Sequence, residues 1–256
     1  MRVVLSSSRY LTYFDMLKNI ITLLTLFLSI TTQAANWSQT NVQFLHGDSY
    51  KKPGDTSYSA TVVTFEHLSP WDYGSNFFFF DIVSPDTESS TSYYGEFAPA
   101  FSLGKMGAFS APDAWLKDVL FQLNFEIPQG PARRANLAGV TLEWKDVGFD
   151  YLATQFLYRD VVGIDGHTGQ LTVAWLKRAG GDWLPLEFSG FLDWAGVEGT
   201  LKDNVHIQAN FLYDLSRKTA QKVPLKAGLE YKYWSNKYGV DGLTENVPQA
   251  KVLWIF

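Results

Sequence analysis

The chain ends on the stretch Pro-Gln-Ala-Lys-Val-Leu-Trp-Ile-Phe at residues 248–256. Successive side chains of an extended strand point to opposite faces, so Trp254 and Phe256 share one face, which is wholly apolar. Gln249 and Lys251 lie on the other face. A bare apolar edge invites aggregation, whereas a barrel removes the edge by closing its last strand on its first. The stretch therefore predicts either the closing strand of a membrane β-barrel or an ordinary buried C-terminal strand.

The composition of the whole chain narrows the protein class. Aromatic residues make up 16% of the 256 residues, a share that suits interfacial belts or aromatic anchors. A mean hydropathy of -0.09 is too low for a bundle of membrane helices but compatible with a barrel whose inward residues are polar. There is no cysteine, which excludes disulfides and thiolate metal sites, and the net charge of -5 argues against nucleic acid as a partner.

The amino-terminal segment has the features of a secretory signal peptide. Lys18 precedes an apolar run at residues 20–30, and small residues follow the run. The run is too short to span a bilayer comfortably. We expect cleavage after Ala34, with Ala35 as the second choice. Met16 would start a better-proportioned signal peptide than the first methionine, so it is an alternative start.

Apolar residues in the remainder of the chain recur at a period of two, not 3.6, which indicates strands. One example is the alternation of Val119, Phe121, Leu123 and Phe125 with Leu120, Gln122, Asn124 and Glu126. Gly, Pro, Asn and Asp fill the gaps between such segments. The pattern predicts about twelve strands, an even number as in bacterial barrels. We place them near residues 37–45, 58–68, 76–83, 93–102, 116–127, 137–146, 150–159, 170–177, 184–192, 204–214, 225–233 and 248–256.

A soluble β-sandwich would show similar alternation with its apolar faces turned inward. The signal peptide, the terminal Phe and the aromatic strand ends favour the barrel. We therefore expect a signal peptide at residues 1–34 and an all-β, transmembrane antiparallel β-barrel of about twelve strands at residues 35–256. The last strand should pair with the first, near residues 37–45, and place Phe256 at the periplasmic rim.

The connections between strands follow from this topology. With both termini in the periplasm, the loops before the even-numbered strands face outward. The turn at residues 147–149 is then periplasmic and is expected to be the tightest of all. The turns at residues 103–115 and 215–224 are longer than expected on that side.

The polar faces of these strands would line a lumen in which charged and aromatic side chains share one parity. Aromatic faces stack on a nucleobase, and carboxylates and amides bind its amino groups and the hydroxyls of a sugar. The alternative is that the charges only pair with one another across the lumen. The run of four phenylalanines at residues 77–80 leaves two choices as well. Phe77 and Phe79 either serve a solute or simply fill the interior, while Phe78 and Phe80 face lipid.

Enzymatic and cofactor-dependent functions find little support in the sequence. The four histidines are scattered and show no metal-binding spacing, and phosphate-binding glycine loops are absent. His67 lies near Ser69, but no oxyanion-type glycine-rich element follows, so an outer-membrane hydrolase is the least favoured alternative. We expect no enzymatic activity, no catalytic residues, no metal and no cofactor.

Several segments, taken together, resemble the nucleoside-specific channel-forming outer-membrane proteins (the Tsx and OmpK-like group). The resemblance runs in order from about Trp37 to Phe256. It is carried by residues 66–81 (Glu-His-Leu-Ser-Pro-Trp-Asp-Tyr-Gly-Ser-Asn-Phe-Phe-Phe-Phe-Asp), 94–97, 158–160, 188–194, 230–239 and 249–256.

This resemblance implies a monomeric outer-membrane barrel of a Gram-negative bacterium that passes nucleosides and deoxynucleosides through a narrow, partly aromatic pore. It also implies outer-membrane lipid as the surroundings and the barrel-assembly machinery as a partner through Phe256. The alternative function is that of a barrel that acts mainly as a surface receptor or binding protein, for example in the attachment of phage or colicin. By parity and motif, the expected pore-lining residues are Glu66, Phe77, Phe79, Asp81, Tyr94, Glu96, Arg159, Glu187, Phe191, Glu230, Lys232 and Trp234.

Overall fold

Twelve antiparallel strands account for most of the chain in the computed structural model, which describes residues 35–54, 56–87, 91–110, 115–129, 132–181, 183–217 and 224–256. The predicted signal peptide and the alternative start lie outside these residues. The strands are β1 (Gln39–Lys52), β2 (Thr56–Trp71), β3 (Gly74–Pro85), β4 (Ser92–Ser102), β5 (Leu116–Pro128), β6 (Ala135–Trp144), β7 (Tyr151–Val161), β8 (Thr168–Ala179), β9 (Leu186–Ala195), β10 (Asn204–Asp214), β11 (Leu225–Ser235) and β12 (Glu245–Ile255). Two short 3-10 helices, η1 (Leu215–Arg217) and η2 (Lys237–Gly239), lie in connections.

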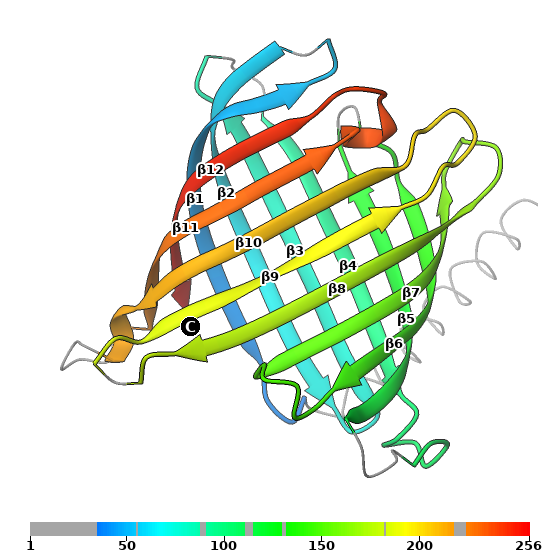
Figure 1. Ribbon diagram of the computed structural model, residues 1–256, viewed down its shortest axis with the longest axis vertical. Coiled ribbons are helices and arrows are strands. Elements are labelled where there is room, and N and C mark those ends of the chain that lie inside the picture. Colours follow the sequence, from blue (N-terminus) through cyan, green and yellow to red (C-terminus); the bar gives the residue numbers. More distant parts are fainter. Residues whose placement is uncertain are drawn as a thin grey trace, which may run out of the picture. The chain divides into compact units, whose positions relative to one another are not determined.

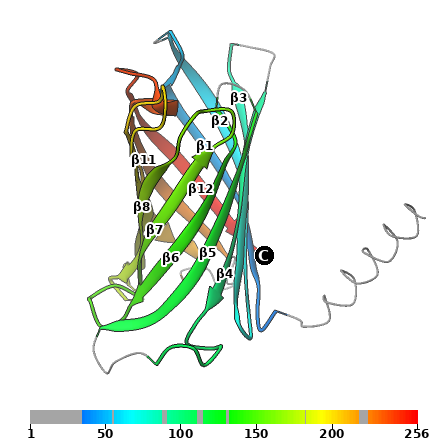
Figure 2. The same cartoon turned by 90° about the vertical axis from the view of Figure 1, so that its right-hand side faces the viewer.

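The strands form a closed barrel in which each strand pairs with its sequence neighbours and β12 pairs with β1 (Figures 1 and 2). The closing register runs from Asn41 opposite Ile255 to Gly47 opposite Gln249. The backbone N–H of Phe256 donates to the carbonyl oxygen of Thr40, which extends the ladder by one residue. The predicted fold class, the twelve strands and the closure of the last strand on the first are therefore confirmed.

The outward faces of the strands are the apolar ones. Phe156, Phe211 and Leu229 lie near the middle of their strands and are 57%, 56% and 58% exposed. Phe78 and Phe80 are also exposed on the outside, as the alternation of the phenylalanine run predicts. A soluble sandwich would bury these faces against a second sheet, so that alternative is wrong.

The prediction that residues 147–149 form the tightest turn is wrong. The turn between β6 and β7 covers residues 145–150, whereas β2 and β3 are joined by Asp72 and Tyr73 alone. Both strands extend further than expected, because Pro70 is tolerated near a strand end and the ladder continues to the pair Trp71 and Gly74. The two long connections, 103–115 and 215–224, are present as predicted.

β12 begins at Glu245, three residues before the predicted start, and includes Pro248. Proline has no backbone N–H to donate, so an interior strand position would normally lose a ladder bond. Pro248 lies opposite Tyr231 on β11, but the pairing of β12 with β1 stops at Gln249. The proline therefore sits where one side of the ladder has already ended.

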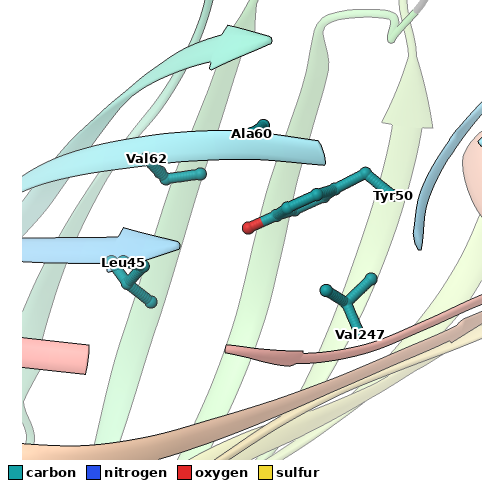
Figure 3. Close-up of a cluster of buried hydrophobic side chains, with 5 residues drawn as sticks. All are labelled: Leu45, Tyr50, Ala60, Val62 and Val247. Carbon is teal, nitrogen blue, oxygen red and sulfur yellow. The ribbon is translucent and has the colours of Figure 1, made fainter. Parts of the chain in front are cut away.

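Parts of the barrel interior are packed with apolar side chains. One cluster consists of Leu45, Tyr50, Ala60, Val62 and Val247 on the wall formed by β12, β1 and β2 (Figure 3). A second cluster consists of Ala135, Leu137, Leu157 and Val161 on β6 and β7, against which Ile164 and Leu201 pack from neighbouring loops. Small barrels fill their interiors with side chains in this way, which leaves a narrower lumen than the backbone alone suggests.

No helix among the described residues is both long and apolar enough to cross a membrane.

Candidate functional site: the barrel lumen

The structure places all twelve predicted pore-lining residues on the inward faces of their strands. None of the twelve is exposed, whereas outward neighbours such as Phe65, Tyr93 and Tyr158 are. Inward orientation agrees with the parity prediction. A role in solute binding stays a prediction for each residue.

One aromatic group lies on the wall formed by β3 and β4. The ring centroids of Phe77 and Phe79 are 6.1 Å apart, and those of Phe79 and Tyr94 are 5.8 Å apart. The rings are tilted by 48° and 43°, so they form a continuous aromatic surface and not a flat stack. The hydroxyl of Tyr94 donates to Glu96 at 2.5 Å, which places a carboxylate at the edge of this surface.

A second aromatic group lies on β9, β10 and β11 and continues into the loop that joins β11 to β12. His206 is at its centre, stacked on Trp234 at 4.4 Å and edge-on to Phe191 at 5.3 Å. Tyr238 on η2 contacts Trp234 at 4.9 Å. Since β3 and β9 are six strands apart in a closed barrel of twelve, the two aromatic groups lie on opposite walls.

His206 and Tyr238 were missed as site residues. His206 lies on the same face of its strand as the polar residues Gln208 and Asn210, so parity alone could have included it. Tyr238 lies outside any strand, and no periodic signal could have found it. Its position depends on a left-handed backbone conformation, with φ of 61°, that follows another at Asn236 with φ of 46°.

Four luminal carboxylates accept hydrogen bonds from neutral donors. Glu66 accepts from the Asn41 amide at 2.8 Å, and Asp81 accepts from the Thr64 hydroxyl at 2.6 Å. Beyond its bond with Tyr94, Glu96 accepts from the Asn124 amide at 2.7 Å. Asp193 accepts from the Thr172 hydroxyl at 2.5 Å. We call Glu66, Asp81, Glu96 and Asp193 the neutral-partnered carboxylates.

Other luminal charges form ion pairs. Arg159 donates to Glu126 at 2.7 Å and to Gln170 at 2.8 Å. Further pairs are Lys226 with Glu187 at 2.5 Å, Lys251 with Glu230 at 2.8 Å, and Lys232 with Glu245 at 3.3 Å. The alternative that luminal charges satisfy one another therefore holds for four of the predicted residues: Arg159, Glu187, Glu230 and Lys232. It does not describe Glu66, Asp81 or Glu96.

The loop of residues 236–244 is fastened to the barrel by Lys237, which is 2% exposed. Its ammonium group binds Glu245 and donates to the carbonyl oxygen of Lys51 at 2.8 Å. Burial, together with the nearby charge of Lys232, lowers the pKa of Lys237 to about 8, although Glu245 opposes this shift. A buried lysine thus joins the loop to both β1 and β12.

His67 and Ser69, the residues considered for a hydrolase, are used otherwise. The Nδ1 atom of His67 lies 2.7 Å from the Thr40 hydroxyl, and its ring stacks on the outward Phe78 at 5.1 Å. Ser69 pairs in register with Asn76 near the end of β2. Within the described ranges, no three His, Cys, Asp or Glu side chains are grouped as a metal site requires.

Comparisons with known proteins identify a shared fold. No family model matches the sequence, and no curated protein matches it. Among solved structures, the KdgM porin in complex with disordered oligogalacturonate matches with a TM-score of 0.50 and 9% identity, over 84% of this chain and 99% of that one. A structure of the KdgM porin alone matches with a TM-score of 0.50 and 8% identity over the same shares. Identities this low show the fold alone: the chain shares the barrel fold of a porin.

Proposed function

We propose that the protein is a passive, substrate-selective channel in the outer membrane of a Gram-negative bacterium, with nucleosides and deoxynucleosides as its solutes. The observation that carries the proposal is the pair of aromatic groups on opposite walls of the lumen, one around Phe79 and one around His206. Carboxylates and amides border the first group, and Gln208 lies 3.4 Å from His206 in the second.

The outward surface supports placement in a membrane. In a closed barrel every backbone polar group in the ladder is paired internally, as a lipid environment requires. Aromatic residues gather near both ends of the strands, for example Trp254 at the rim of the termini and Tyr158 toward the opposite rim, which are 50% and 52% exposed. Such residues suit the two interfaces of a bilayer. With the predicted signal peptide, this favours the outer membrane.

The chemistry of a nucleoside fits the lumen described. A base can stack on Phe77, Phe79 or Tyr94, and stacking of this kind contributes about 1–3 kcal/mol per base. Glu66, Asp81 and Glu96 can accept hydrogen bonds from sugar hydroxyls or exocyclic amino groups. Diffusion down a gradient requires neither a cofactor nor a nucleotide-hydrolysing site.

An acidic oligosaccharide, the ligand of the KdgM porin, is the contrasting candidate because the fold is shared. Such a polyanion would have to pass the neutral-partnered carboxylates. The luminal cations Arg159, Lys226, Lys232 and Lys251 are each bound to a carboxylate already. The charge arrangement therefore favours the nucleoside, which is uncharged.

Ionic current through the purified protein in a planar bilayer tests the proposal. Adenosine or thymidine should reduce the current reversibly, whereas a neutral sugar of similar size should not. Phe79→Ala should weaken the block by roughly tenfold, since a stacking surface worth about 1–3 kcal/mol is lost. Phe78→Ala is the matched control, because it removes the same side chain from the outward face of the same strand. Equal effects of the two variants, or no block of the wild type, would refute the nucleoside assignment.

A further inference from the structure

The charges of the lumen do not balance. Each of the four luminal cations named above is bound to a different carboxylate, Glu126, Glu187, Glu230 or Glu245, and Arg178 and Lys237 add a second cation to Glu187 and Glu245. Glu66, Asp81, Glu96 and Asp193 are left with amide and hydroxyl donors. A neutral donor satisfies the lone pairs of a carboxylate and brings no compensating charge, so each of these four acids, when ionised, adds an unpaired negative charge to the lumen.

Two of these carboxylates, Glu66 and Glu96, are neighbours of one phenylalanine on the wall formed by β2, β3 and β4. Glu66 on β2 lies opposite Phe79 on β3, and Phe79 lies opposite Glu96 on β4. Glu96 in turn lies opposite Glu126 on β5. Register partners on adjacent strands are direct neighbours, so Glu66, Phe79, Glu96 and Glu126 form a row across the tilted strands of this wall.

The opposite wall contributes to the same region. Asp193 on β9 is joined to Glu126 by a chain of hydrogen bonds that runs through Thr172, Gln170 and Arg159. A solute in this part of the lumen therefore passes both Glu96 and Asp193, while the nearby cation, Arg159, is already paired with Glu126.

We infer that Glu96 and Asp193, supported by Glu66 and Asp81, form a charge filter that makes the barrel selective for cations over anions. Fixed charges of one sign inside a narrow passage with low-dielectric walls raise the local concentration of counterions and repel ions of the same sign. The filter favours solutes that are neutral or that carry an ammonium group, and it excludes phosphorylated or carboxylated solutes. The inference rests on the channel part of the proposed function and not on the identity of the solute.

The reversal potential in an asymmetric KCl gradient measures this selectivity directly. The wild-type barrel should prefer K⁺ over Cl⁻ by several-fold. The double variant Glu96→Gln, Asp193→Asn keeps the shape of both side chains and removes their charge, so its permeability ratio should fall toward one. Asp146→Asn is the matched control. It removes a carboxylate from an exposed turn, and Asn tolerates the left-handed backbone found there, with φ of 59°.

The outcomes separate the two proposals. An anion preference in the wild type overturns the filter. So does an unchanged permeability ratio in a double variant whose circular dichroism and conductance confirm a folded, open barrel. A cation preference without any nucleoside block keeps the filter and refutes only the nucleoside assignment. A folded barrel that conducts no current refutes both.

Discussion

At the scale of single residues, alternation decides which side chains meet the lumen. The phenylalanine run at residues 77–80 is the clearest case, since parity alone separates Phe77 and Phe79 from Phe78 and Phe80. Parity cannot tell which inward charges neutralise one another. Lys251 reaches Glu230 on β11 and Asn210 on β10, and these contacts depend on the register between three strands. Only the folded barrel therefore shows which luminal carboxylates form ion pairs and which accept hydrogen bonds from neutral donors alone.

Lys237 predicts a pH dependence of ion selectivity. With a pKa near 8, its ammonium group is charged at pH 7 and mostly neutral at pH 9. The groups that face it are Glu245 on β12, Lys232 on β11, the carbonyl oxygen of Lys51 on β1, and Tyr238. Burial raises the pKa of Tyr238 to about 12, so this side chain stays neutral over the same range. The mouth of the lumen thus becomes more negative as pH rises.

The reversal potential should accordingly shift toward stronger cation preference between pH 7 and pH 9. Lys237→Met keeps most of the apolar stem and has no group to titrate, so this variant should lose the part of the shift centred near pH 8. An identical pH profile in the variant and the wild type would show that Lys237 does not set the charge of the mouth.

At the scale of elements, the periodic pattern located every strand and the two long connections. The periodic pattern misplaced some strand ends, because residues typical of turns lie there in segments that pair with a neighbouring strand. Ser69 and Pro70 look like turn residues, yet β2 continues to Trp71 because the β2–β3 ladder holds both strands there. Pro248 looks like the start of β12, yet β12 begins at Glu245. No periodic pattern in residues 236–244 could predict that this loop is attached to the barrel. Its attachment depends on the contact of Lys237 with Lys51, which is far away in the sequence.

Glu245 should control the attachment of this loop. It is fully buried, pairs with Lys232 and Lys237, and accepts a hydrogen bond from the backbone N–H of Lys51 at 2.7 Å. Removing one partner of a buried ion pair typically costs about 3–5 kcal/mol, because the other charge is left uncompensated. Glu245→Ala should therefore release the loop and expose Lys237.

Limited trypsin digestion measures this release. The wild-type barrel should resist cleavage after the buried Lys237, and Glu245→Ala should be cut there much faster. Cleavage after Arg133, which is exposed in the connection between β5 and β6, serves as the internal control in both proteins. Equal cleavage after Lys237 in both proteins would contradict a fastening role for Glu245.

At the scale of the whole molecule, closure of β12 on β1 accounts for the apolar face of the terminal stretch. Val252 and Trp254 are 40% and 50% exposed on the outside, whereas Gln249 and Lys251 are buried in the lumen. The sequence predicted this division because the period of two holds throughout the strands. It could not predict the apolar cluster around Tyr50, which bridges β1, β2 and β12 inside the barrel.

The outward face should be the one in contact with lipid. Phe156→Arg places a charge on that face near the middle of β7, where a cation facing lipid costs about 2–4 kcal/mol. Gln155→Arg places the same charge on the adjacent inward position and should be tolerated better. Urea titration of the barrel in lipid vesicles, followed by tryptophan fluorescence, should show a lower midpoint for Phe156→Arg than for Gln155→Arg. A lower midpoint for Gln155→Arg than for Phe156→Arg would contradict the placement of lipid against the outward face.

We propose that a solute passes through this barrel and is recognised by the aromatic and charged faces of its lumen. Single-channel conductance of the purified barrel, with and without a panel of nucleosides, tests it most directly. We expect discrete open-channel currents that adenosine or thymidine interrupts in a concentration-dependent way, with weaker interruption in Phe79→Ala than in Phe78→Ala. A folded barrel that gives no current, or currents that no nucleoside interrupts, would contradict it.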